Sequence, residues 1–360
     1  MSSFQFTRYL YDKTEVMQSL TMCLLDADAK EDALFWAYEL HHSGLTEELT
    51  NLFWTVYYDF FYILNPGFES YLLKKMSKKS ATESGDKLVA EIVGNFMARP
   101  HTLDVFLIKQ CHAHNIRPVG PLVDMCFDDS GNVGTGDIQY NKFLKTTKST
   151  HKYQYQSEHI QTVLLARLLQ QHTFVQQLPA SSSSSSPPSS TLICGKNHYV
   201  RVTAEEVVSY ETILASLPLL PAYKILSLAR VCAIDAHGYL SLFASSKREI
   251  SDMALAYREN WLYHAFCTPL WRQRIDAHGG AVVDAIHRQV LFNDESGEES
   301  FHVCFGYEPD EQAAEIQLQS IRPFSKQRTM ESFCKEHPVT GLFDFSCLQT
   351  SDVCSVLFFF

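Results

Sequence analysis

The chain has 360 residues, 46% hydrophobic and 20% charged, which is typical of a globular protein with one large or two moderate cores. Its net charge of −11 opposes phosphate, so broad non-specific nucleic-acid binding is disfavoured. The chain has no apolar run of about 18 residues, no secretion signal and no C-x-x-C among its ten cysteines, which predicts no membrane span and reduced thiols.

The first 66 residues predict three consecutive helices. The first is expected over 12–25, and the second over 30–42, closed by Gly44 in the left-handed conformation. Thr46 is expected to cap the third helix, which runs over 46–65 and stops before a proline. This third helix carries a full apolar stripe and a second aromatic row, so it is expected to lie between neighbouring helices.

Further helices are predicted after this run, over 68–76, 86–97, 102–114 and 157–178. Short connections between successive helices favour antiparallel hairpins, stacked as a bundle or an irregular solenoid. The sequence therefore predicts a mostly α fold that begins with a stack of helical hairpins.

A low-complexity tract, PASSSSSSPPSS, follows this stack. Such a tract cannot bury apolar surface, so it is expected to be a disordered linker or surface loop. The predicted organisation is an N-terminal helical-hairpin domain over 1–178, a linker over 179–191, and a mostly helical region over 192–360 that could pack on the first domain.

The C-terminal region predicts shorter helices. A capping box opens a helix at 203–217, and further helices are expected over 223–231 and 248–267. The segment LWRQRIDAHGG is expected to be a separate short helix closed by its glycines, and 282–292 fits either a helix or a strand. This ambiguity leaves room for a minor β element near the C-terminus.

A basic edge is predicted at the end of the helix over 68–76. Its cations are spaced at i, i+1, i+4 and i+5 and are Lys74, Lys75, Lys78 and Lys79. The edge could contact phosphate, although cations near a helix C-terminus are also favoured by the helix dipole.

The string I-D-A-H-G occurs twice and places Asp235 beside His237 and Asp276 beside His278. A carboxylate near an imidazole could orient a general base, but no nucleophile or oxyanion donor accompanies either pair. Because glycine follows directly in both cases, helix termination is the preferred interpretation.

No catalytic, cofactor-binding or metal site is predicted. Cys111, His112 and His114 form C-H-x-H without a second ligand pair nearby, and the acidic loop over 128–139 lacks the glycine and closing acid of a calcium loop. The acidic segments around 294–299 and 308–315 are interpreted as solvated helix starts, with a docking surface for a basic partner as the alternative.

Four tryptophans lie in predicted helices. Most are expected in the core, but Trp261 and Trp271 are also candidate anchors of a protein interface.

Four strings carry a resemblance to a known family: FWAYELHHSG, YYDFFYILNP, NWLYHAFCTPLWRQRI and FGYEPDEQ. With these strings, the chain resembles a family of uncharacterised proteins of nucleocytoplasmic large DNA viruses. The resemblance implies expression in the cytoplasm of an infected eukaryotic host, as a virion component or an infection-stage factor. It implies no activity and no site residues.

Surplus aromatic helix faces without a reactive motif favour a non-enzymatic protein-interaction or assembly role, with protein partners. Two alternatives stay open. One is a metal-assisted hydrolase that uses the carboxylates and histidines of 235–311, and the other is a nucleic-acid-associated factor that uses the lysine edge.

Overall fold

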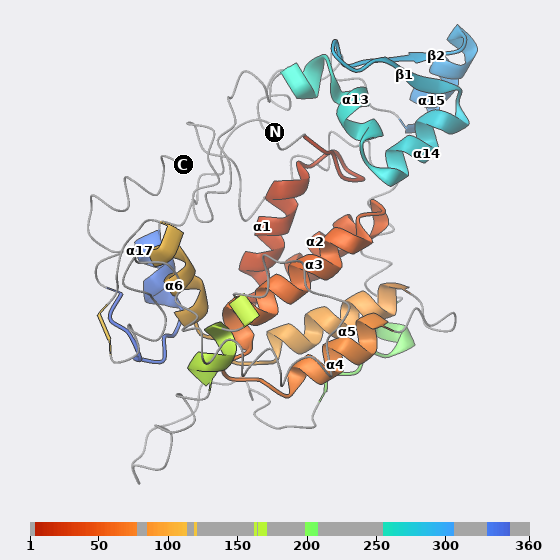
Figure 1. Cartoon of the computed structure of the whole chain (residues 1–360). Coiled ribbons are helices and arrows are strands. Elements are labelled where there is room, and N and C mark those ends of the chain that lie inside the picture. Colours follow the sequence, from red (N-terminus) through yellow and green to blue (C-terminus); the bar gives the residue numbers. More distant parts are fainter. Residues whose placement is uncertain are drawn as a thin grey trace.

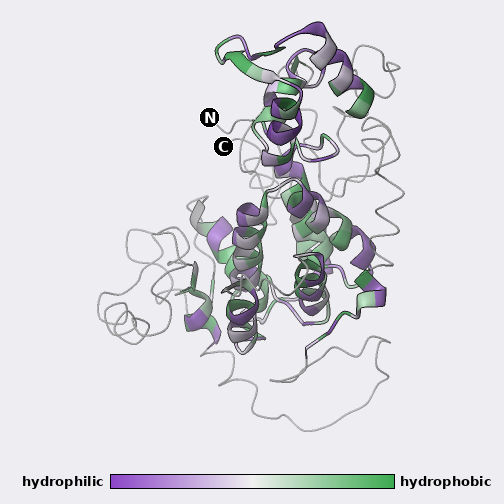
Figure 2. Ribbon diagram, turned by 90° about the vertical axis from the view of Figure 1, so that its right-hand side faces the viewer, coloured by the Kyte–Doolittle hydropathy of each residue, from purple (hydrophilic) through white to green (hydrophobic). Residues whose placement is uncertain are grey.

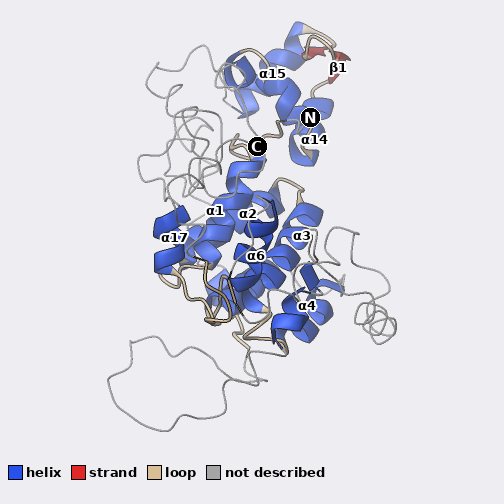
Figure 3. Ribbon diagram, turned by 60° about the vertical axis from the view of Figure 1, so that its left-hand side comes forward, coloured by secondary structure: helices blue, strands red, loops and turns tan. Residues whose placement is uncertain are grey.

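The computed structural model of the chain describes residues 4–77, 85–113, 119–120, 162–163, 165–170, 199–207, 255–305 and 330–345. Within these residues the protein is mostly α-helical with one small antiparallel sheet, which confirms the predicted fold class (Figures 1 and 3). None of the described helices combines the length and apolar character that crossing a membrane requires. The predicted linker over 179–191 and the predicted helix over 223–231 lie outside the described residues.

The first two helices follow the sequence prediction closely. Helix α1 spans Lys13–Leu24 and helix α2 spans Lys30–His42. The Asp12 carboxylate caps α1 by accepting the backbone N–H groups of its first turn. Gly44 follows α2 with φ of +80°, the left-handed conformation expected of it.

The third helix differs from the prediction at both ends. Helix α3 spans Thr46–Val56 and continues into a π-helical turn, η1, over Tyr57–Phe61. The prediction that Thr46 caps this helix is wrong: Leu45 is the cap residue, because its carbonyl accepts the N–H of Leu49 (3.0 Å) as the first helical hydrogen bond. All five consecutive residues of η1 are buried, so the π-helical turn lies inside the core.

Three further helices complete the N-terminal bundle: α4 (Phe68–Ser77), α5 (Gly85–Met97) and α6 (Asp104–Ala113). Their inner faces meet η1 through aromatic rings. Phe96 of α5 is the centre of this contact, with ring centroids 5.1 Å from Phe61 and 5.2 Å from Phe68. Figure 2 shows hydrophilic and hydrophobic segments alternating along the helices of the chain, as expected of elements with one face in a core.

A short described piece from the middle of the chain, residues 199–207, packs on this bundle. Asn95 of α5 donates its side-chain amide to the carbonyl of Val200 (2.8 Å) and accepts the N–H of Val200 (2.9 Å). The capping box predicted at Thr203 is confirmed, because Thr203 and Glu206 each accept the other's backbone N–H.

A C-terminal unit lies at one end of the bundle in Figure 1. It contains α13 (Trp261–Phe266), α14 (Pro269–Ala277), the antiparallel strands β1 (Gly280–Asp284) and β2 (Gln289–Phe292), and α15 (Glu295–Phe305). The segment with ambiguous periodicity therefore belongs to a β-hairpin, and the predicted separate short helix is α14.

The predicted continuous helix over 248–267 is wrong in its described part. The backbone N–H groups of Glu259 and Asn260 both donate to the carbonyl of Leu255, and Asn260 leaves the helical conformation with φ of −121°. Helix α13 starts afresh at the next residue. This break lets the short helix carry its aromatic residues toward the N-terminal segment.

A last helix, α17 (Met330–Glu336), and the segment after it lie against α6 (Figure 1). Leu103 donates its N–H to the carbonyl of Pro338 (3.0 Å). The buried Asp104 carboxylate accepts both the N–H (2.9 Å) and the hydroxyl (2.6 Å) of Thr340. The C-terminal segment is thus fastened to the bundle by a buried acid.

Candidate functional site

A tight turn over residues 6–12 connects the N-terminal bundle with the C-terminal unit. Thr7 donates its N–H to the carbonyl of Tyr11 (2.9 Å), and Phe6 and Asp12 form an isolated β-bridge. Leu10 is fully buried and has φ of +63°, a conformation that leucine rarely adopts. Strong tertiary contacts must therefore hold this turn in place.

Glu39 of α2 provides the first of these contacts. Its side chain is 0% exposed and accepts hydrogen bonds from the backbone N–H of Tyr9 (2.7 Å) and from Arg8 Nε (3.2 Å). Ser43 accepts the N–H of Arg8 through its hydroxyl oxygen (2.7 Å). A buried carboxylate is stable only with such compensation, so Glu39 and the turn depend on each other.

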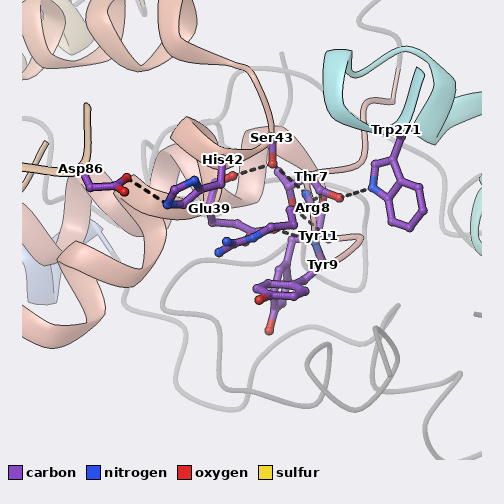
Figure 4. Close-up of polar contacts among 9 residues, drawn as sticks. All are labelled: Thr7, Arg8, Tyr9, Tyr11, Glu39, His42, Ser43, Asp86 and Trp271. Carbon is purple, nitrogen blue, oxygen red and sulfur yellow. Dashed lines mark hydrogen bonds and ion pairs between the residues drawn. The ribbon is translucent and has the colours of Figure 1, made fainter. Parts of the chain in front are cut away.

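The C-terminal unit provides the second set of contacts. Trp271 of α14 donates its indole N–H to the carbonyl of Thr7 (2.9 Å), and Thr268 donates its hydroxyl to the carbonyl of Phe6 (2.7 Å). Figure 4 shows Glu39 and Trp271 reaching the turn from opposite sides. The turn is therefore the joint between the two parts of the chain.

A second arginine lies at this joint. The guanidinium of Arg274 lies 4.7 Å from the ring centre of Trp271 and 4.6 Å from that of Phe305. Burial lowers the pKa of Arg274, and the like charge of Arg8 lowers it further. Burial also raises the pKa of Tyr9.

The two tryptophans singled out as interface candidates are buried in this unit. Trp261 packs edge-to-face on Trp271 with ring centroids 5.8 Å apart, and both indoles contact Phe301 of α15. Their rings are used within the chain, so neither indole is presented to a partner.

The acid–base candidates do not share one environment. Asp276 is exposed on α14. His278 instead has its Nδ1 2.9 Å from the backbone carbonyl oxygen of Arg274, and its ring packs on aromatic residues of α15. His278 ends α14 and is followed by Gly279 with φ of +77°, which agrees with the helix-end interpretation. Asp235 and His237 lie outside the described residues.

The lysine edge is also divided. Lys74 is exposed, whereas Lys75 forms an ion pair with Glu91 of α5 (2.5 Å). Lys78 and Lys79 lie outside the described residues. Of the two lysines that the structure describes, Lys74 therefore faces solvent, and Lys75 is paired with a carboxylate of the chain.

Metal ligation finds no geometric support among the residues that the structure describes, where no three His, Cys, Asp or Glu side chains gather as a metal cage. Cys111 is fully buried, and the side chains of His112 and His114 are not described. The hydrolase alternative has no described cleft in which its residues converge.

The β1–β2 hairpin gathers three exposed large aliphatic side chains of the described residues, and no motif in the sequence marked it. Val283 is 56% exposed, Leu291 58% and Ile286 87%. Val282, Val290 and Phe292 are half-buried against the unit, whereas Ala281 and Leu291 are paired and exposed on the other side. Val283 is also exposed and lies at a register shift between the strands. We call this exposed side, with Val283 and with Ile286 at the turn, the outer face of the hairpin. The period-two alternation was the sequence signal for it.

No protein-family model, curated protein or solved structure matches this chain. The resemblance to the viral family, and the host cytoplasm that it implies, stay predictions.

Proposed function

We propose that the chain is a non-enzymatic protein-interaction protein, and that the outer face of the hairpin holds a basic, extended segment of a partner protein. The observation that carries this proposal is the exposure of three large aliphatic side chains, Val283, Ile286 and Leu291, on one short hairpin. Clustered apolar side chains at a surface are typical of binding sites.

The backbone of the hairpin supports an extended partner. Among the described residues β1 pairs only with β2, so each strand has an outer edge with backbone groups available for a further strand. An extended peptide can add to such an edge, gaining affinity from main-chain hydrogen bonds and specificity from alternate side chains.

The charge around the hairpin supports a basic partner. Between residues 280 and 305 the acidic side chains outnumber the single arginine, Arg288; they are Asp284, Asp294, Glu295, Glu298 and Glu299. The four carboxylates of the 294–299 segment are exposed. Lysines alternating with aliphatic residues would therefore match both the charge and the apolar face.

The test uses the full chain and a fluorescein-labelled peptide of eight alternating lysines and valines, followed by fluorescence anisotropy. We expect saturable binding that weakens with salt, and no binding of the matched glutamate–valine peptide. The double variant Val283→Lys/Leu291→Lys should weaken binding at least roughly tenfold, or about 1.4 kcal/mol.

Val339→Lys is the matched control, because Val339 is also an exposed aliphatic residue but lies in the segment after α17. It should bind the peptide like the unchanged chain. Equal binding by the double variant would overturn the proposal. So would sedimentation showing that the unchanged chain self-associates and the double variant is monomeric, since the face would then be filled by a second copy.

A further inference from the structure

The joint between the bundle and the C-terminal unit contains a concentration of hydrogen-bond donors that the interaction role does not use. Arg8 and Tyr9 come from the N-terminal turn, and Arg274 comes from α14. The indole of Trp271 contacts both elements: its N–H donates to the carbonyl of Thr7, and its ring lies against the Arg274 guanidinium.

Donor groups of the turn remain available after the internal contacts are made. Arg8 directs Nε to Glu39, while its Nη2 lies 3.2 Å from the same carboxylate as an ion pair but makes no hydrogen bond. Tyr9 is 6% exposed, and its hydroxyl is buried without a hydrogen-bond partner. A buried hydroxyl left unpaired is unfavourable by about 1–3 kcal/mol, which a ligand oxygen would relieve.

The charges at the joint do not balance. Glu39 is paired with Arg8, and no carboxylate of the described residues lies within ion-pair distance of Arg274. Glu39 is thus occupied by Arg8, whereas the Arg274 guanidinium lies against the rings of Trp271 and Phe305. A partly buried site with an excess guanidinium favours an anion.

We propose that Arg8, Tyr9 and Arg274 form a binding site for a phosphate group. Three donor side chains on two separate elements suit a tetrahedral anion with several acceptor oxygens better than a planar carboxylate with two. A phosphate bound there would contact both parts of the chain and strengthen the joint. The site is separate from the outer face of the hairpin and does not depend on the proposed partner.

The test measures thermal unfolding and tryptophan fluorescence of the full chain during titration with inorganic phosphate at constant ionic strength. Sodium chloride and sodium acetate serve as reference anions. We expect a saturable rise in melting temperature and a saturable fluorescence change with phosphate alone, because Arg274 lies on Trp271. Phosphoserine and adenosine monophosphate test the larger carriers of the group, and tighter binding of either one would identify its source.

Two variants locate the site. Arg274→Gln should weaken phosphate binding at least tenfold, and Tyr9→Phe, which removes only the unpaired hydroxyl, should weaken it several-fold. Arg272→Gln is the matched control, because Arg272 is exposed on the same helix, and it should bind like the unchanged chain. The proposal is overturned if phosphate acts no differently from chloride, or if folded Tyr9→Phe and Arg274→Gln respond like Arg272→Gln.

Discussion

Replacing Glu39 by glutamine tests whether one buried carboxylate holds the N-terminal turn. Glu39 is fully buried, and it accepts both the N–H of Tyr9 and the Nε–H of Arg8, whose side chain is 13% exposed. Glutamine keeps the shape but offers one acceptor oxygen, so one donor is left unpaired and the guanidinium loses its counter-charge. Hydrogen bonds to charged groups contribute about 1.5–3 kcal/mol each, and breaking a buried ion pair costs about 3–5 kcal/mol. We expect Glu39→Gln to lower the free energy of unfolding by about 3 kcal/mol.

Urea unfolding followed by circular dichroism and tryptophan fluorescence measures this loss. Glu48→Gln is the matched control, because Glu48 belongs to the more exposed pair with Lys13, in which the charges are 3.9 Å apart. Surface pairs of this kind contribute about 0–1 kcal/mol. If Glu39→Gln shifts the urea midpoint no more than Glu48→Gln, the reasoning about the turn is refuted.

Two further perturbations test the packing of other parts. Gly44→Ala should destabilise the chain by at least about 1 kcal/mol, because its φ is +80° and a Cβ would lie 2.8 Å from Pro269 Cβ; thermal unfolding that matches the unchanged chain would contradict this. His101 lies 3.0 Å from His337, and burial first, then the charge of His337, lowers its pKa from 6.5 to about 4. The unfolded chain therefore binds a proton at His101 more readily than the folded chain does. The contribution of neutral His101 to the free energy of unfolding is complete above about pH 6.5 and falls by up to about 3 kcal/mol as the pH drops to 4. His101→Gln should flatten this part of the profile of unfolding free energy against pH, and an unchanged slope would count against it.

The helices of the N-terminal bundle could be predicted because local signals specify them. The Asp12 cap and the left-handed Gly44 act within a few residues, as does the Thr203 capping box outside the bundle, and the structure has each of them. The π-turn at 57–61 could not be predicted, because the same aromatic spacing fits an ordinary helix.

The two proposed surfaces depend on contacts between distant parts of the chain, which a local pattern does not contain. No local pattern marked Glu39, since its partner Arg8 lies 31 positions earlier in the chain. The hairpin was ambiguous because its strands are short and its turn lacks glycine: Arg288 itself takes the left-handed position, with φ of +57°. Asp284 closes that turn by accepting the N–H groups of the two residues after Ala285.

The most direct test of the proposed interaction role is amide hydrogen exchange of the full chain with and without the lysine–valine peptide. Binding by strand addition predicts slower exchange at backbone N–H groups of residues 280–292, where the described sheet has its outer edges. Protection should be weaker in the Val283→Lys/Leu291→Lys variant. Unchanged exchange over 280–292 in the presence of saturating peptide, or protection confined to the helices of the N-terminal bundle, would contradict the account.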